Sequence, residues 1–131
     1  LDIRAPADAQ RVAAVADIQA AIARIAAERD VRVEVSLTYE APATPCNSRL
    51  MQLLADSIEG LGIRARRLPS GAGHDAMAFR GVLPLAMLFV RCRGGISHHP
   101  SEHASAADID VAARVLASFI ASYASEFAKS T

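Results

Sequence analysis

The sequence lacks an excess of charge of either sign. Fourteen Lys and Arg residues balance fourteen Asp and Glu residues, so the formal net charge is zero. Proteins that bind nucleic acid or anionic membranes usually carry a basic face, and this composition provides none. Long apolar runs are also missing, because the longest, residues 83–90, is far too short to cross a bilayer. The sequence therefore predicts neither nucleic acid nor a membrane as a partner.

Cysteine is scarce as well. Cys46 and Cys92 are the only two, and their spacing matches no CxxC or other metal-ligand motif. We interpret them as free, buried thiols in a reducing compartment, which predicts a cytoplasmic protein. A disulfide between them stays open as an alternative, although no feature of the sequence requires one.

The composition is that of a protein that forms a core, with 52% hydrophobic and 21% charged residues. The first forty residues predict a β-α-β unit. Apolar residues alternate with polar ones over residues 1–4 and again over residues 31–39, which is the period of a half-buried strand. Between them, after Pro6, apolar residues recur every three or four positions and predict an amphipathic helix.

Two prolines between residues 40 and 45 interrupt helix and strand alike. We therefore predict one domain over residues 1–40 and a second over residues 41–131. In the second domain, Asn47 or Ser48 can cap a helix that stops at Gly62.

Two further strands and a long final helix complete the second predicted domain. Residues 63–68 predict a short strand, and the continuously apolar residues 83–90 predict a strand covered on both faces. Ser105 and Asp108 resemble a capping box before the final helix. Because helices and strands alternate, the predicted fold class is α/β.

All four histidines lie in two loops of the second predicted domain, at strand ends, where open α/β sheets bind their ligands. A single loop histidine is usually an ordinary solvated residue. Histidine is also the commonest metal ligand, and the four together favour a functional site.

The first histidine loop, residues 70–76, reads Ser-Gly-Ala-Gly-His-Asp-Ala and contains His74. Its glycines let the backbone approach a ligand, and a helix N-terminus after it would attract negative charge. The loop matches the weak dinucleotide pattern GxGxxA, but the next apolar strand ends in Arg91 instead of an acidic residue, so we reject that reading. Without GxSxG, Ser70 is not predicted to be a nucleophile. A purely structural turn remains the alternative.

The second loop, residues 95–103, holds three histidines and Glu102. It is not HExxH, so at most one or two of its side chains can bind the same metal. Catalytic zinc takes about three protein ligands, and the chain offers no good further one. Amide hydrolysis at a metal also needs a general base, whereas Glu102 suits bracing its own loop equally well. The residues alone predict a histidine-lined cleft with an incomplete site.

Together, the two loops resemble those of the amidohydrolase branch of the aminoacylase/carboxypeptidase-like metallopeptidases. This branch includes N-carbamoyl-L-amino-acid hydrolases, allantoate amidohydrolases and β-ureidopropionase-like enzymes. Its members carry an SGAGHDA loop and, after a buried strand, a G-(I/V)-S-H-(N/H)-P-x-E loop. Residues 70–76 and 95–102 match both in order and separation, with His99 where Asn is commoner. Residues 1–4 resemble a strand of the family's lid domain, so the resemblance covers essentially the whole chain.

The resemblance implies a zinc-peptidase-like catalytic domain and a ferredoxin-like lid, of which residues 1–40 would be the second half. It implies that His98 is the last metal ligand and that Arg4 binds the substrate carboxylate, for which a bidentate guanidinium is suited. Gly73 and His74 would line the substrate pocket. The implied cofactor is zinc or manganese, at a two-metal site in the complete enzyme. In the family, the other ligands and the general base precede the residues present here.

We therefore expect a C-terminal fragment that has no catalytic residue of its own, binds metal weakly or not at all and is inactive in isolation. The implied reaction is hydrolysis of non-peptide C–N bonds in N-carbamoyl or ureido amino-acid-type substrates, which carry a carboxylate. The alternatives are an aminoacylase or dipeptidase of the same superfamily, or a non-catalytic binding or dimerisation module. Half a lid leaves open strand edges, so we expect a homodimer or pairing with the missing part of the enzyme.

Overall fold

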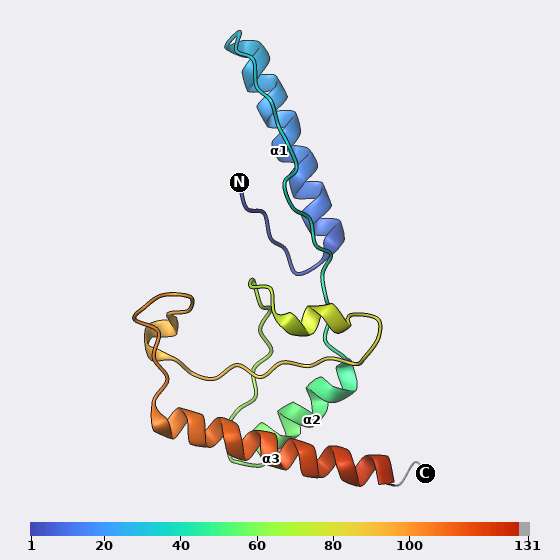
Figure 1. The fold of residues 1–131 in the computed structure, drawn as a ribbon, viewed down its shortest axis with the longest axis vertical. Coiled ribbons are helices and arrows are strands. Elements are labelled where there is room, and N and C mark those ends of the chain that lie inside the picture. Colours follow the sequence, from blue (N-terminus) through green and yellow to red (C-terminus); the bar gives the residue numbers. More distant parts are fainter. Residues whose placement is uncertain (129–131) are drawn as a thin grey trace. The chain divides into compact units, whose positions relative to one another are not determined.

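The computed structural model describes residues 1–128, apart from the side chain of Phe127. Its helices are α1 (Asp8–Glu28), α2 (Ser48–Glu59) and α3 (Ala106–Ala128), with two 3-10 turns, η1 (Asp75–Phe79) and η2 (Arg93–Gly95) (Figure 1). The chain divides into two compact units. The first comprises Leu1–Thr44 and Leu68–Met77, and the second comprises Pro45–Arg67 and the residues from Ala78 onward. No helix among the described residues is long and apolar enough to span a membrane.

The first unit is built around α1, which confirms the predicted helix. Asp8 lies in its first turn, where a carboxylate complements the helix dipole. At its other end, the N–H of Val31 donates to the carbonyl of Ala26, 3.0 Å away. No residue of α1 is buried, and Val12 on its predicted apolar face is 55% exposed. The helix is thus formed, and its apolar face is only partly covered, since Val15, Ile18 and Ile22 are half-buried.

A clasp formed by Asp8, Arg11 and Glu40 ties the segment after α1 to the start of this helix. Arg11 donates to Glu40 at 2.7 Å and to Asp8 at 3.2 Å. Asp8 also accepts from the backbone N–H of Ala43 at 3.0 Å. The hydrogen bond to Glu40, followed by that to Asp8, raises the pKa of Arg11, so its charge is constant at any ordinary pH.

The predicted β-α-β unit is wrong in its two strands. Within residues 1–128 the structure contains no β-strand, so neither residues 1–4 nor residues 31–39 form one. Residues 31–39 run alongside α1 as an open segment (Figure 1). Their apolar side chains remain about half or more exposed, from 50% at Val33 to 80% at Tyr39. The physical reason is that a strand bonds only to a neighbouring strand, and this unit supplies none.

The second unit has the small core of this chain, where α2 packs across α3 (Figure 1). Its buried hydrophobic side chains are Leu53, Leu54 and Val115. Asn47 caps α2, because its side-chain oxygen accepts from the N–H groups of Arg49 and Leu50 at 3.0 and 3.1 Å. This confirms the predicted cap.

The other predicted helix ends also agree with the structure. Gly62, at the predicted stop, has φ +74°, a conformation that glycine adopts without strain. Ser105 precedes α3, and its hydroxyl accepts from the N–H of Asp108 at 3.1 Å while donating to the carboxylate of Asp108 at 2.6 Å. The helices of the predicted α/β class are therefore present.

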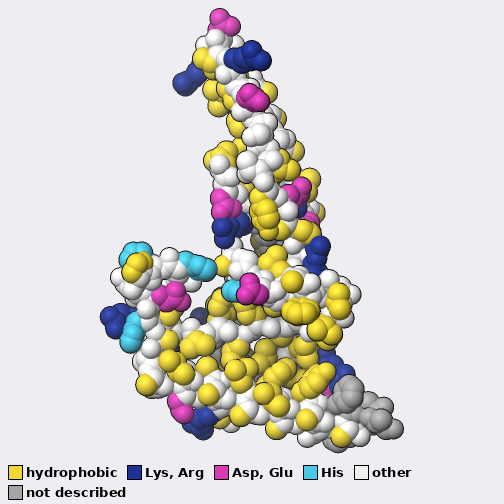
Figure 2. Space-filling view, in the orientation of Figure 1, with side chains coloured by type: hydrophobic (Ala, Val, Ile, Leu, Met, Phe, Trp, Pro, Cys, Tyr) yellow, Lys and Arg dark blue, Asp and Glu magenta, His cyan; other side chains and the backbone are white. Residues whose placement is uncertain are grey.

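The predicted strands of the second domain, residues 63–68 and 83–90, are absent from the described part of the chain. Residues 83–90 were expected to be covered on both faces, yet Leu83 is 55% exposed and Phe89 is 51% exposed. Hydrophobic side chains are visible at the surface of both units (Figure 2). A buried strand needs neighbours on both edges and layers on both faces, and this chain does not provide them.

Candidate functional site

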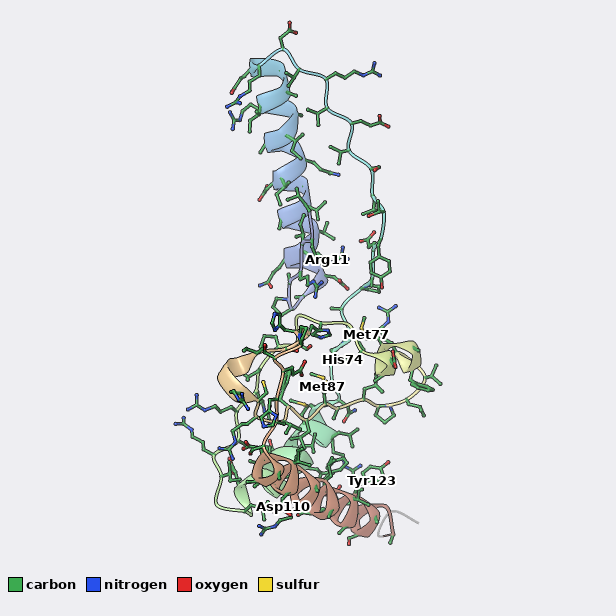
Figure 3. The ribbon with its side chains drawn as sticks, turned by 60° about the vertical axis from the view of Figure 1, so that its left-hand side comes forward. Arg11, His74, Met77, Met87, Asp110 and Tyr123 are labelled. Atoms are coloured by element: carbon green, nitrogen blue, oxygen red, sulfur yellow. The ribbon has the colours of Figure 1, made fainter. Side chains whose placement is uncertain are left out.

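The glycine loop, residues 70–76, is held by hydrogen bonds around Ser70. The hydroxyl of Ser70 accepts from the N–H of Ala72 at 3.2 Å and lies 3.1 Å from Nε2 of His74. Which of these two side chains donates depends on the tautomer of His74. The backbone N–H of His74 faces the sulfur of Met77 at 3.5 Å, and both residues are labelled in Figure 3. The loop therefore fixes the imidazole of His74 through its own residues.

The glycines of this loop are not required by the packing of the unit. A Cβ at Gly71 would meet no atom within 4 Å, and one at Gly73 would meet only the sulfur of Met77 at 3.6 Å, an ordinary contact. Neither residue has a positive φ. The space beside the loop is thus open to a ligand. A helical turn does follow the loop, as predicted, but it is η1, a 3-10 turn of 5 residues.

Arg4 contacts the glycine loop although 67 residues separate it from Gly71. One guanidinium nitrogen of Arg4 donates to the carbonyl of Gly71. The guanidinium also binds the carboxylate of Asp2, with Nε 3.0 Å from Oδ1 and the other terminal nitrogen 2.5 Å from Oδ2. The side chain of Arg4 is 59% exposed. The first unit therefore brings the predicted carboxylate-binding arginine against the loop that contains Gly73 and His74.

The charge of Asp2 is stabilised by the same contact. The hydrogen bonds that Arg4 donates to Asp2 lower the pKa of Asp2 and raise the pKa of Arg4. Both groups are consequently ionised near neutral pH. A substrate carboxylate that used Arg4 would have to replace Asp2 as its partner.

His98 lies in the second unit, in a turn of unusual backbone geometry. Its φ is +56°. Its N–H donates to Oε2 of Glu102 at 2.8 Å, and the N–H of Glu102 donates to the carbonyl of His99 at 2.9 Å. His99 accepts from the N–H of Ser101 through Nδ1 at 3.1 Å. The imidazole of His98 is exposed to solvent, whereas one nitrogen of His99 is occupied by its own turn.

The described residues do not make a complete metal site. Among them, no group of three or more His, Cys, Asp or Glu side chains lies close enough together to hold a metal ion. Catalytic zinc takes about three protein ligands, so the described residues do not supply a full ligand set by themselves. His98 belongs to one unit, and Arg4, Gly73 and His74 to the other. Their convergence on one cleft stays a prediction.

Sequence reasoning missed two contacts of the candidate site. The pair Asp2–Arg4 was missed, although its i, i+2 spacing puts both side chains on one side of an extended segment. The pairing of Ser70 with His74 was also missed, whereas the bond from His98 to Glu102 agrees with the alternative that Glu102 braces its own loop. Such local contacts depend on turn geometry, which the residue types alone did not specify.

The cysteines are free thiols, as predicted, but their environment differs from the prediction. Cys46 is exposed and Cys92 is only half-buried. The thiol of Cys92 donates to the carbonyl of Ile96 at 3.2 Å. The prediction of two buried thiols was wrong, and for Cys92 the reason is that the preceding residues 83–90 do not form the expected strand.

Comparison with known proteins decides the family. Residues 5–122 match the family described as Peptidase family M20/M25/M40. The chain belongs to this family. The M20/M25/M40 assignment confirms the resemblance predicted from the two loops, and the similar proteins agree with it.

Several curated relatives of the M20/M25/M40 chain are amidohydrolases or deiminases by name. It is 38% identical over 128 residues to allantoate deiminase 2 of Glycine max, which covers 92% of this chain and 26% of that protein. It is 35% identical over 116 residues to the N-carbamoyl-L-amino-acid amidohydrolase of Pseudomonas sp. (strain NS671), covering 88% and 28%. It is 32% identical over 90 residues to the allantoate amidohydrolase of Escherichia coli (strain K12), covering 69% and 22%. The chain thus spans about a quarter of the length of these relatives.

Proposed function

We propose that this chain contributes the substrate-carboxylate site and one metal ligand to a metal-dependent amidohydrolase. The reaction is hydrolysis of non-peptide C–N bonds in N-carbamoyl or ureido amino-acid-type substrates. One observation carries the proposal: Arg4 donates to the carbonyl of Gly71, which puts a guanidinium beside the glycine loop. The names of the relatives support the substrate class, since they include allantoate and N-carbamoyl-L-amino acids.

Arg4 and the glycine loop would share the work of holding the substrate. A guanidinium binds a carboxylate through two parallel hydrogen bonds, as Arg4 now binds Asp2. Gly73 leaves room for the substrate to approach the backbone. The imidazole of His74, oriented by Ser70 through Nε2, would present Nδ1 to the substrate, as donor or acceptor according to the tautomer. These groups bind and orient the substrate, and none of them is the general base.

Zinc or manganese would supply a Lewis acid and an activated water in the complete protein. From this chain His98 would hold it, and the further ligands and the base would come from residues outside the chain. We place the protein in the cytoplasm, a proposal that the free thiols of Cys46 and Cys92 support.

The carboxylate site can be tested by titrating the 15N-labelled chain with an N-carbamoyl amino acid. We expect amide shifts at Gly71, Gly73 and His74, and no shifts with the carboxamide analogue, which lacks the carboxylate. Arg4→Lys should weaken binding about tenfold, because an ammonium cannot form the paired hydrogen bonds. Arg24→Lys, an exposed arginine of α1, is the matched control. Equal affinity of the Arg4→Lys variant would contradict the proposal.

Gly73→Ala separates binding from folding in the same titration. The added Cβ meets only Met77, so we expect a change of less than about 0.5 kcal/mol in the free energy of unfolding. Substrate binding should fall about tenfold, because the methyl group occupies the ligand's approach to the backbone. Unchanged binding would show that Gly73 does not line the substrate pocket. An N-acyl amino acid that binds better than the N-carbamoyl compound would favour an aminoacylase or dipeptidase instead.

The open segment 31–39 supports a second proposal, that it pairs with another copy of this chain. Val35 is 55% exposed, Leu37 is 76% exposed, and residues 32–42 form no backbone-to-backbone hydrogen bond among the described residues. Such a segment is a template for an added strand. The alternative is that a part of the whole protein outside this chain pairs with the same segment.

Sedimentation velocity distinguishes these occupants. If copies pair, the wild-type chain sediments as a dimer, and the double variant Val35→Lys with Leu37→Lys sediments as a monomer. Val12→Lys, which changes an equally exposed position of α1, should leave the dimer intact. A wild-type chain that is monomeric at every concentration would overturn the homodimer and favour the other occupant.

A further inference from the structure

The backbone of His98 has a conformation that its own side chain disfavours. At φ +56° the Cβ of an L-residue crowds the backbone, so residues other than glycine adopt this angle rarely, although asparagine, aspartate and histidine do so more often than the rest. Histidine at this angle needs neighbouring contacts to hold it. The φ of His98 therefore points to a specific restraint within its turn.

Glu102 provides this restraint twice. Its carboxylate accepts the N–H of His98 at 2.8 Å, and its own N–H donates to the carbonyl of His99 at 2.9 Å. Pro100 stands between these residues, and its ring restricts both its own φ and the conformation of His99. The turn is thus closed from both sides, and Glu102 is the residue whose side chain bonds directly to the backbone of His98.

We propose that Glu102 is a positioning residue for His98. Its carboxylate fixes the φ of His98 and so sets the direction in which the Cα–Cβ bond carries the imidazole. The proposed role is a hydrogen bond from the backbone of His98 to Oε2, and it is distinct from that of a metal ligand or a general base. The inference rests on the proposed function in one respect, namely that His98 is the side chain used to hold the metal.

The conformational part is tested on the 15N-labelled 131-residue chain without metal. A positive φ brings the amide and α protons of one residue close together, so His98 should show a strong NOE between them. In Glu102→Ala this NOE should weaken, and exchange of the His98 amide with solvent should become about tenfold faster. Glu102→Gln keeps a side-chain oxygen acceptor and should restore both readouts.

The controls separate a local effect from a loss of fold. Glu59→Ala, an exposed glutamate of the same unit, should leave the His98 signals unchanged. In every variant the amides of Leu53 and Val115 should keep their protection, because these residues form the core of the unit. An unchanged NOE and exchange rate in Glu102→Ala, or failure of Glu102→Gln to restore them, would overturn the positioning role.

The metal part is tested separately with Mn²⁺ alone. Paramagnetic broadening of the His98 ring signals should occur in the wild-type chain and should need several-fold more Mn²⁺ in Glu102→Ala. Equal broadening in both proteins would show that the turn does not control the imidazole, and would overturn the inference. Absence of broadening in the wild type, with the conformational results as expected, would instead contradict the role of His98 in the proposed function.

Discussion

The two units of this chain differ in how the hydrogen bonds of their backbones are satisfied. In the second unit, α2 and α3 each have a side-chain cap, and they bury Leu53, Leu54 and Val115 between them. In the first unit, α1 has no side-chain cap at Ala7 and buries no residue, and residues 31–39 beside it form no strand. A helix completes its own hydrogen bonds, whereas a strand depends on a neighbour. The first unit therefore depends far more on residues outside itself to satisfy its backbone and to cover its apolar side chains.

Removing a core side chain should affect only the second unit. Leu54 is 6% exposed, so Leu54→Ala should lower the free energy of unfolding by about 2–5 kcal/mol, through lost burial and a residual cavity. Val12→Ala, at a position of α1 that is 55% exposed, should change it by less than about 0.5 kcal/mol. Urea denaturation measures both. A comparable loss at Val12 would mean that α1 has a covered face, and the contrast between the units would fail.

Removing the cap of α2 and adding one to α1 should reduce the difference in helix stability between the units. Asn47→Ala removes the acceptor for the N–H groups of Arg49 and Leu50 and should destabilise α2 by about 1 kcal/mol. Ala7→Asn provides such an acceptor for α1, which has none, and should stabilise it by roughly 0.5–1 kcal/mol. Amide exchange in the first turn of each helix reports both changes. The stability of α2 should fall and that of α1 should rise. Two changes in the same direction would contradict the role of the caps.

The smallest effect concerns the exposed pair Asp2–Arg4, which links the start of the first unit to the glycine loop through Arg4. Since Arg4 lowers the pKa of Asp2, the pair's contribution is complete above the ordinary value of 3.8 and is lost as pH falls through the lowered pKa. In Arg4→Gln the titration midpoint of Asp2 should rise toward that ordinary value. Side-chain carboxyl 13C NMR measures the midpoint, and the same midpoint in both proteins would show that Arg4 does not hold Asp2.

The helices and their caps could be predicted from the sequence because their signals are local. Asn47 before a periodic apolar stripe, Gly62 after it and Ser105 three residues before Asp108 determine helix ends without reference to the rest of the molecule. The alternation over residues 31–39 is equally clear, but its outcome depends on a partner strand that a pattern cannot supply. The strands were therefore predicted where this chain alone does not form them.

In the candidate site, too, local sequence patterns could be predicted and contacts between distant residues could not. The two loops carry a recognisable residue pattern, and the family it predicted is confirmed. The contact of Arg4 with Gly71 joins residues 67 positions apart, which no spacing rule anticipates. The positive φ of His98 was equally hidden, because most histidines have a negative φ and the residue type alone does not specify such a turn.

The clasp of Asp8, Arg11 and Glu40 has a consequence for any strand that docks on residues 31–39. One end of this segment is fixed where Val31 bonds to Ala26, and the other where Glu40 and Ala43 bond to the start of α1. Much of the chain entropy that docking would otherwise remove is already lost before a partner arrives. Segment 31–39 is therefore preorganised for an incoming strand. Arg11→Ala, which removes the clasp, should weaken association with the partner strand although it changes no residue of this segment.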